Sequence, residues 1–352
     1  MLRKAKLAAL SLCKGAGGFE LVANSTWRQR RLLILCYHGT SLDDEHQWRP
    51  RLYIPPQVLD LRLEALRAMR CSVLPLDEAL ERLHKHDLPP RSVAVTFDDG
   101  TYDFYRQAYP LLKKHGIPVT VYQTTYYTDH EMPVFNLICS YMLWKRRGEQ
   151  LPPCPELQIP ESLDLRTEAG RHRVVRCLID RSDRENLTGV EKDEIAKKLA
   201  EVLGIDYATI TRKRILQLMN AREVAEIARD GVDIQLHTHR HRTPEEENLF
   251  RREIADNRSR LQSITGREGR HFCYPSGIYR KEFFDWLKKE RVDSATTCDA
   301  GLASPEDNPL LLPRFVDTSG RTQVEFESWL SGVGSLLALR KATPQRYILP
   351  GD

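Results

Sequence analysis

Short apolar runs recur along the chain, and most of them are followed by a segment with helical periodicity. Residues 32–37 are continuously apolar, as expected for a strand that is buried on both faces. Residues 76–83 instead place leucine and alanine at helical spacing. Strands that alternate with helices predict a parallel sheet and an α/β fold. We expect eight runs to be strands: residues 32–37, 72–76, 93–97, 119–123, 233–236, 271–274, 294–297 and 312–315.

The number and spacing of these units indicate the architecture. Seven or eight strand–helix units favour a closed barrel over an open sheet, so we predict a distorted (β/α)7-8 barrel of parallel strands. No clear strand occurs between residues 123 and 233, a gap far longer than an ordinary loop, and this predicts a helical insertion. The predicted organisation is an N-terminal amphipathic segment (1–30), a barrel (31–340) with the insertion at about 131–225, and a C-terminal tail (341–352).

Composition and charge narrow the choice of partners and compartment. The chain has 53 basic and 49 acidic residues, too balanced to indicate a nucleic-acid partner. No run reaches the roughly 20 apolar residues of a membrane span, so only peripheral membrane contact is left open. The short apolar run near the N-terminus is not typical of a signal peptide, and the eight cysteines include no C-x-x-C pair. A cytoplasmic location is favoured over export or membrane association, and the oligomeric state is not predicted.

Two adjacent carboxylates mark the first candidate site. Asp98 and Asp99 come directly after the predicted strand 93–97. The carboxyl end of a barrel strand is where active sites are built. Because neighbouring carboxylates repel each other, we expect a cation close by, and a divalent metal ion is the simplest one.

A histidine cluster supplies the ligands that such an ion would need. His237 and His241 follow the predicted strand 233–236 and are four residues apart, so that one helical turn would place both on one face. Two imidazoles and one carboxylate form a facial ligand set that leaves positions open for water and substrate. The pair of histidines alone is a weak signal. Its coincidence with the acidic pair at another strand end predicts a metal site.

These residues resemble the motifs of a known family. Thr96-Phe-Asp-Asp-Gly100 and His237-Thr-His-Arg-His241 are similar to the first two motifs of the polysaccharide deacetylases of carbohydrate esterase family 4, the NodB homology domain. Tyr37-His38 resembles the segment that opens many members, and Arg270-His-Phe-Cys-Tyr-Pro275 resembles the third motif, Arg-x-Phe-Arg-x-Pro. The resemblance covers roughly residues 32–315 without the insertion. It implies that Asp99, His237 and His241 hold the metal and that Asp98 is the catalytic base.

The chain departs from this family pattern at two positions. Cys273 stands in place of the second arginine of the third motif, and Arg314 either supplies the missing guanidinium to Asp98 or forms a surface ion pair. The family's last motif holds a histidine that acts as general acid, but this chain has no histidine after residue 271. His38 is then a candidate acid, with a structural histidine as the alternative. For the oxyanion we expect a backbone N–H in the turn Tyr274, Pro275, Ser276.

The resemblance and the residues together predict a function. We expect metal-dependent hydrolysis of N-acetyl groups on a polysaccharide or oligosaccharide that contains N-acetylglucosamine. Zn²⁺ is the favoured ion, with Co²⁺ or Ni²⁺ as alternatives. Two other functions stay open from sequence alone: a small-molecule amidohydrolase on the same barrel, and a non-catalytic protein that binds a metal or a carbohydrate. The missing general-acid histidine favours the last of these, whereas an acid next to the metal ligand speaks against it.

Overall fold

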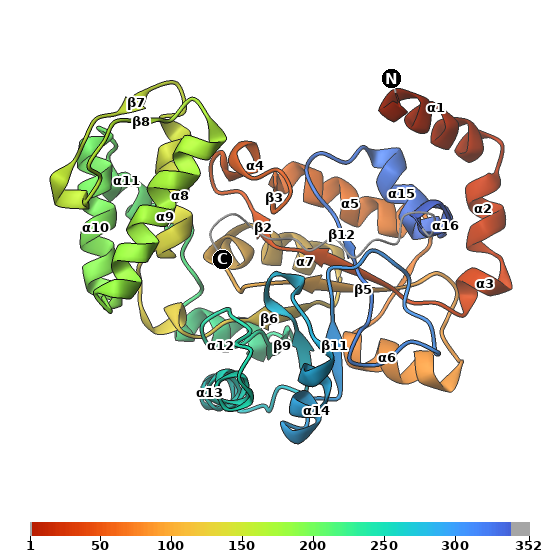
Figure 1. The fold of residues 1–352 in the computed structure, drawn as a ribbon. Coiled ribbons are helices and arrows are strands. Elements are labelled where there is room, and N and C mark those ends of the chain that lie inside the picture. The colour runs from red at the N-terminus through yellow and green to blue at the C-terminus, as the bar shows by residue number, and fades with distance from the viewer. Residues whose placement is uncertain (1, 339–352) are drawn as a thin grey trace.

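The computed structural model describes residues 2–338 of the 352-residue chain. Its main sheet has eight parallel strands in the order β11-β10-β9-β6-β5-β1-β12, and β4 pairs with β5 beside this path. Figure 1 shows the sheet curled at the centre of the molecule with helices around it. The strands are β1 (Leu33–Tyr37), β4 (Ser72–Val73), β5 (Ser92–Phe97), β6 (Thr120–Gln123), β9 (Asp233–Leu236), β10 (His271–Cys273), β11 (Ser294–Thr296) and β12 (Phe315–Val316).

The predicted parallel barrel is confirmed, and the segment before β12 explains its distortion. Leu312 first pairs with Thr296 of β11, and Phe315 then pairs with Leu35 of β1. One stretch of chain therefore joins the two ends of the curled sheet. This is also why the last strand begins three residues later than the sequence predicts, since the apolar run from residue 312 serves two neighbours in succession.

Helices cover the outside of the barrel and bury one face each. Asn220 caps α12 by accepting a hydrogen bond from the Glu223 N–H, and the Glu223 side chain accepts one from the Asn220 N–H. The buried face of α12 then packs on the barrel core through Val224 and Ile227. The helices around the barrel are α5 (Pro56–Ala68), α6 (Leu76–Lys85), α7 (Tyr109–His115), α12 (Ala221–Arg229), α13 (Glu247–Thr265) and α14 (Lys281–Lys289), and η1 (Phe104–Ala108) precedes α7.

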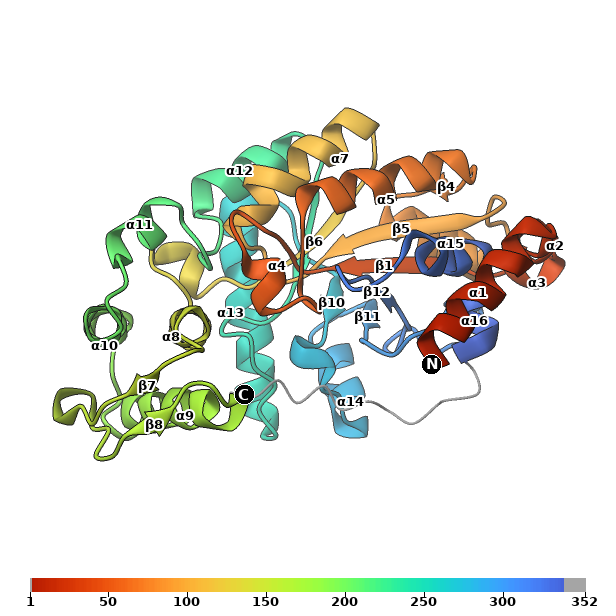
Figure 2. The same ribbon diagram turned by 90° about the horizontal axis from the view of Figure 1, so that it is seen from above.

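The region between β6 and α12 builds a second hydrophobic core at one side of the barrel (Figure 2). Ile138, Leu178 and Leu199 come from three different helices and meet there, each nearly inaccessible to solvent. A small antiparallel ribbon, which the sequence does not predict, lies within it. The elements are η2 (Tyr127–Asp129), α8 (Phe135–Lys145), β7 (Gln150–Leu151), η3 (Pro155–Leu157), β8 (Leu163–Asp164), α9 (Glu168–Arg184), α10 (Gly189–Val202) and α11 (Tyr207–Arg212).

The helices near the two ends of the described chain lie together, on the side away from α8–α11 in Figure 1. Leu10, Phe19 and Val333 form a small apolar cluster between them. None of the helices within residues 2–338 has the length and apolar character needed to cross a membrane. The remaining elements are α1 (Leu2–Gly15), α2 (Gly18–Ala23), α3 (Thr26–Gln29), β2 (Gly39–Thr40), α4 (Glu45–Trp48), β3 (Tyr53–Ile54), η4 (Pro275–Gly277), α15 (Gln323–Ser331) and α16 (Val333–Ala338).

Candidate active site

The second acidic residue after β5, Asp99, and the histidine cluster after β9 meet at the carboxyl ends of the strands. The Asp99 Oδ1 atom lies 3.2 Å from His237 Nε2 and 3.2 Å from His241 Nε2. His237 Nδ1 is 2.8 Å from the Cys273 carbonyl oxygen, so Nδ1–H donates there and the lone pair of Nε2 faces Asp99. The three possible ligand atoms lie within 4.8 Å of one another, and the hydrogen bond at Nδ1 fixes the orientation of the His237 ring. Such a set fits a divalent cation.

The backbone that carries these ligands is not helical, so the predicted helical turn is wrong. Residues 237–246 form an irregular loop. Thr238 and His241 have φ angles of 63° and 55°, and Asp99 has 71°. A β-branched residue such as threonine rarely adopts this left-handed conformation, which is characteristic of functional sites. The loop turns back on itself there, and the two histidine rings end 4.9 Å apart.

Asp98 points to a different group of partners and is buried. Its Oδ1 and Oδ2 atoms each accept a hydrogen bond of 2.7 Å from the Arg314 guanidinium, through Nη1 and Nη2. Arg314 is fully inaccessible to solvent, which rules out a surface ion pair. Burial opposes the charged form of Asp98, but the charge and hydrogen bonds of Arg314 outweigh it and hold the pKa of Asp98 well below its usual range. Asp98 is therefore an oriented, ionised carboxylate.

Two thiols complete the surroundings of Asp98, and neither is among the predicted site residues. Cys36 Sγ lies 3.5 Å and Cys273 Sγ 3.4 Å from Asp98 Oδ2. Burial raises the pKa of both thiols well above the ordinary value, so they stay protonated and donate to the carboxylate. Arg314 Nη2 lies only 3.1 Å from Cys273 Sγ. A small side chain at residue 273 leaves the room that the Arg314 guanidinium occupies.

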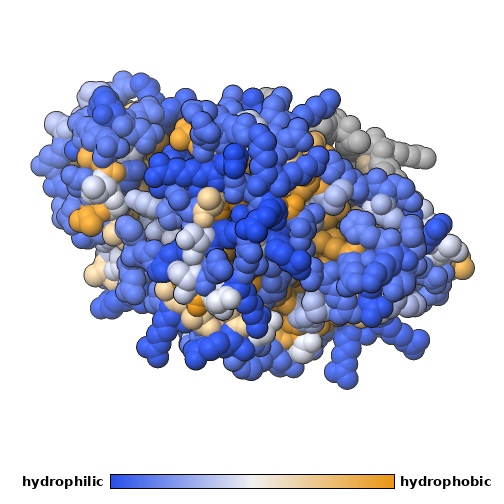
Figure 3. Space-filling model, turned by 90° about the horizontal axis from the view of Figure 1, so that it is seen from below, coloured by the Kyte–Doolittle hydropathy of each residue, from blue (hydrophilic) through white to orange (hydrophobic). Residues whose placement is uncertain are grey.

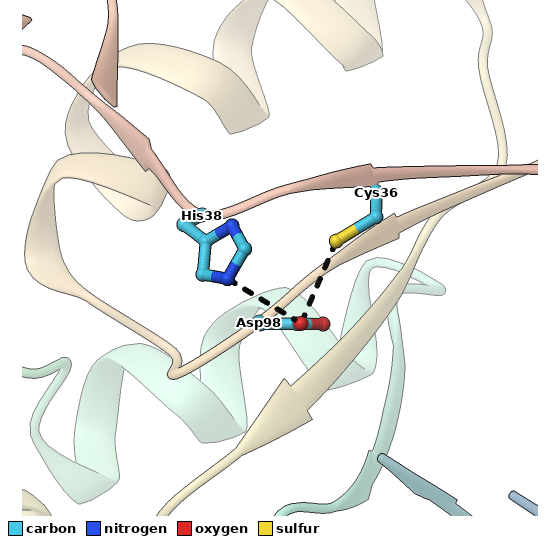
Figure 4. A group of neighbouring side chains, drawn as sticks. All are labelled: Cys36, His38 and Asp98. Carbon is cyan, nitrogen blue, oxygen red and sulfur yellow. Dashed lines mark hydrogen bonds and ion pairs between the residues drawn. The ribbon is translucent and has the colours of Figure 1, made fainter. Parts of the chain in front are cut away.

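His38 faces the same carboxylate from the end of β1 (Figure 4). Its Nε2 atom is 3.7 Å from Asp98 Oδ2, and 17% of its side chain is exposed. Burial lowers the pKa of His38, against the opposing charge of Asp98. His38 is therefore largely neutral at pH 7 and close enough to exchange protons with the site. The position of Cys36 in the site could have been predicted from the sequence, because the side chains of residues 36 and 38 point to the same face of a strand.

The turn at residues 274–276 lies on the rim. The Tyr274 N–H donates to the Thr296 carbonyl oxygen and Pro275 has no N–H. Ser276 lines the pocket and has a φ of 56°. Tyr274 is a wall residue whose hydroxyl donates to the Leu310 carbonyl oxygen.

One pocket of about 390 Å³ is lined by His38, Asp98, Asp99, His237 and His241. The region between β6 and α12 supplies another part of its wall, including Val134, Leu137 and Leu216. Leu216 has a φ of 59°, unusual for leucine, and this turn directs it to the pocket. The rim also carries Arg240 and Arg242, which both contact Glu253. The wall thus combines the candidate ligands with an apolar surface from outside the barrel.

A buried carboxyl near the pocket gives a testable pH dependence. Asp103 Oδ1 accepts hydrogen bonds from Thr40 N and Thr101 Oγ1, and burial raises the pKa of Asp103 to about 8. The folded protein therefore keeps a proton that the unfolded chain loses near pH 4, and folding stability falls as pH rises from about 4 to about 8. Asp103→Asn keeps a side-chain oxygen that can accept these two hydrogen bonds, but its amide does not titrate in this pH range. Urea unfolding of the metal-free proteins should show the stability of the variant relative to wild type rising by at least about 2 kcal/mol across that range. A constant difference would contradict this assignment.

Known proteins resemble the chain in sequence and in fold. The model of the polysaccharide deacetylase family matches residues 85–174 and 184–293, more than half of the chain. Over 98 residues the chain is 32% identical to YxkH of Bacillus subtilis, an inferred polysaccharide deacetylase, and this match spans 28% of the chain but only 33% of that relative.

Two solved structures share the fold. The Streptococcus pyogenes deacetylase PplD superposes with a TM-score of 0.54 at 18% identity, over 82% of this chain and 93% of that one. IcaB from Ammonifex degensii gives 0.53 at 18% identity, over 86% and 97%. At such identities the similarity shows a common fold only. Because the family match itself covers both the acidic pair and the histidine cluster, the chain belongs to the polysaccharide deacetylase family.

Proposed function

We propose that this protein hydrolyses the N-acetyl group of N-acetylglucosamine units in an oligosaccharide or polysaccharide, with the help of a divalent cation. The observation that carries the proposal is the junction of two groups: Asp99 with two histidines on one side, and the ionised Asp98 with Arg314 on the other. Family membership supports the same class of reaction. The related fold of PplD was solved with acetate, which is the product expected here.

The cation would be held by Asp99 Oδ1, His237 Nε2 and His241 Nε2. A cation at these ligands would lower the pKa of water to about 7 and polarise an acyl oxygen. Nitrogen and oxygen ligands in a set of three favour Zn²⁺, and Co²⁺ or Ni²⁺ could replace it. The hydrogen bond from His237 Nδ1 to the Cys273 carbonyl keeps that ligand in the required tautomer.

Asp98 would take the proton of the attacking water, and His38 would return one to the departing nitrogen. Arg314 and the two thiols hold Asp98 in one orientation, which reduces the reorganisation needed during the reaction. His38 Nε2 faces Asp98 Oδ2 and opens to the pocket, so it could receive a proton there and donate it to the amine. Ser276 on the rim would offer the main-chain donor to the oxyanion.

A test of this proposal measures acetate release from N-acetylglucosamine oligomers of increasing length and from small amides. We expect activity on the oligomers, loss of activity with a chelator, and recovery on addition of Zn²⁺ or Co²⁺. Activity on small amides alone would favour the amidohydrolase function, and metal binding without any acetate release would favour a non-catalytic protein.

The ligand set can be tested separately by metal content. His241→Ala should lose the bound cation, because one of three ligands is removed and its side chain is already one-third exposed, which limits any effect on folding. His239→Ala is the matched control, since His239 Nδ1 is 2.9 Å from Thr125 Oγ1 and is not in the ligand set. Equal metal content in the two variants would contradict the assigned ligands.

A further inference from the structure

The N-terminal segment of the chain has a large excess of basic over acidic residues. Residues 1–31 contain seven basic residues and a single acidic one, a formal charge of +6, whereas the whole chain has +4. The other residues therefore carry a net charge of −2. An asymmetry of this kind indicates a negatively charged partner for the N-terminal segment.

The inner side of α1 is fixed to the rest of the protein. Leu10 is 3% exposed and packs in the cluster with Phe19 and Val333. Lys6 and Lys14 reach inward to α15, where Lys6 Nζ is 3.3 Å from Glu325 and Lys14 Nζ is 2.5 Å from Glu327. Both lysine side chains stay about half exposed. The orientation of the helix about its axis is thus determined by contacts on one side.

The outer side of α1 carries an apolar stripe that belongs to none of the hydrophobic clusters formed by residues 3–338. Residues 5, 8, 9 and 12 follow the i, i+3, i+4, i+7 spacing of one helix face, and all four are exposed. Leu12 is 74% exposed, and Leu21 in the neighbouring α2 is 76% exposed. These are the highest values among the large apolar side chains of residues 3–338. The stripe is made of Ala5, Ala8, Ala9 and Leu12.

A further pair of exposed leucines belongs to the same end of the molecule. Leu336 and Leu337 of α16 are 41% and 53% exposed, and α16 contacts α2. In Figure 1, α1, α2 and α16 form one group at the end opposite α8–α11. By contrast, the surface seen from below in Figure 3 is mainly hydrophilic, with apolar residues in small patches.

We propose that the apolar stripe of α1 and Leu21 of α2 dock on an anionic lipid membrane, with the exposed Arg3 and Lys4 and the half-exposed Lys6 and Lys14 of α1 close to the headgroups. An apolar face beside lysine and arginine is the pattern of a helix that lies in the membrane interface. Helix α1 has 14 residues and several charges, which suits this position and not a span. A second copy of the chain is disfavoured as the partner, because a symmetric contact would bring two segments of +6 together.

The docked orientation is compatible with the rest of the structure. Helix α3 lies at the amino ends of the strands, since Arg28 donates a hydrogen bond to the carbonyl oxygen of Ser92, where β5 begins. The pocket lies at the carboxyl ends of the same strands. Docking through the N-terminal helices would therefore leave the pocket accessible. The inference is independent of the proposed reaction.

Sedimentation of the full-length protein with lipid vesicles tests the proposal. One set of vesicles contains phosphatidylcholine with 30% phosphatidylglycerol, and the other contains phosphatidylcholine alone. We expect binding to the anionic vesicles that weakens when NaCl is raised from 0.1 to 0.5 M, and at least tenfold weaker binding to the neutral ones. No binding to the anionic vesicles, or equal binding to both, would overturn the proposal.

A pair of matched variants shows whether this surface is responsible. Leu12→Glu/Leu21→Glu should weaken anionic vesicle binding at least tenfold, and both side chains are exposed enough for the fold to persist. Leu61→Glu/Val190→Glu makes the same change of charge at two other exposed apolar positions, 54% and 62% exposed, and should change binding less than twofold. Equal losses in the two variants would contradict docking through α1 and α2. Docking on a membrane would also be contradicted if the wild type bound no vesicles and formed a dimer that only Leu12→Glu/Leu21→Glu dissociates.

Discussion

Asp98→Asn is expected to lower the rate of acetate release by about a thousand-fold. The amide that replaces the carboxylate cannot accept the proton of the attacking water, and general acid–base catalysis contributes about 10²–10⁴-fold. Metal content should stay unchanged, because the proposed ligands are Asp99, His237 and His241, which form one of the groups able to hold a metal ion. Acetate release and metal content, measured on the same purified sample, separate the proton acceptor from the ligand set.

The variant needs a control because Asp98 also has a structural role. Its removal leaves the fully buried Arg314 guanidinium without a carboxylate, which is expected to destabilise the fold. Asp98→Asn/Arg314→Met removes both buried charges, so it should be more stable than Asp98→Asn. Its rate of acetate release should be as low as that of the single variant. If either variant is folded and loses less than tenfold in rate, Asp98 is not the proton acceptor.

The strands were predictable from sequence for a simple physical reason. A parallel strand that is buried on both faces has to be apolar along its whole length, and five of five residues in β1 are buried. The location of the acidic pair at the carboxyl end of a strand was also predictable, because the pair directly follows such an apolar run. The start of β12 was not predictable in this way, because tertiary pairing with two different neighbours decides which residues form the regular strand.

The arrangement around the histidines could not be read from the sequence. The spacing of His237 and His241 is compatible with a helical turn, and only the left-handed backbone at Thr238 shows that the loop brings them together differently. The partner of Asp98 was also undecided, since a buried and an exposed arginine look the same in a sequence. Cys273 is the residue from which a buried position of Arg314 could have been inferred. A cysteine in place of the family's arginine implies that another side chain fills the space of that arginine.

Arg314→Met is expected to destabilise the folded protein by about 3–5 kcal/mol at pH 7, the cost of leaving one member of a buried ion pair without its partner. Methionine approximates the length and volume of the arginine stem, so that a cavity contributes little. Arg314 also donates to the Thr297 carbonyl oxygen, and the loss of this bond adds to the effect. Urea unfolding of the metal-free protein measures the change.

The pH dependence distinguishes a lost ion pair from lost packing. In the wild type the pKa of Asp98 is lowered by Arg314, so the pair stabilises the fold above the unfolded pKa of about 4 and loses this contribution as pH falls. Without Arg314, the strongest opposition to the effect of burial is gone and the pKa of Asp98 rises, so the variant loses stability as pH rises. The difference between the two proteins should therefore be largest at neutral pH and shrink toward pH 4.

The double variant Asp98→Asn/Arg314→Met completes the argument. If the buried charge of Asp98 causes the instability of Arg314→Met, its neutralisation should restore part of the free energy of unfolding and abolish the pH dependence. A loss that is independent of pH and additive with that of Asp98→Asn would instead mean that Arg314 acts through packing and its bond to Thr297. The pair would then orient Asp98 by shape alone, and a neutral side chain of equal size at residue 314 would keep the rate of acetate release.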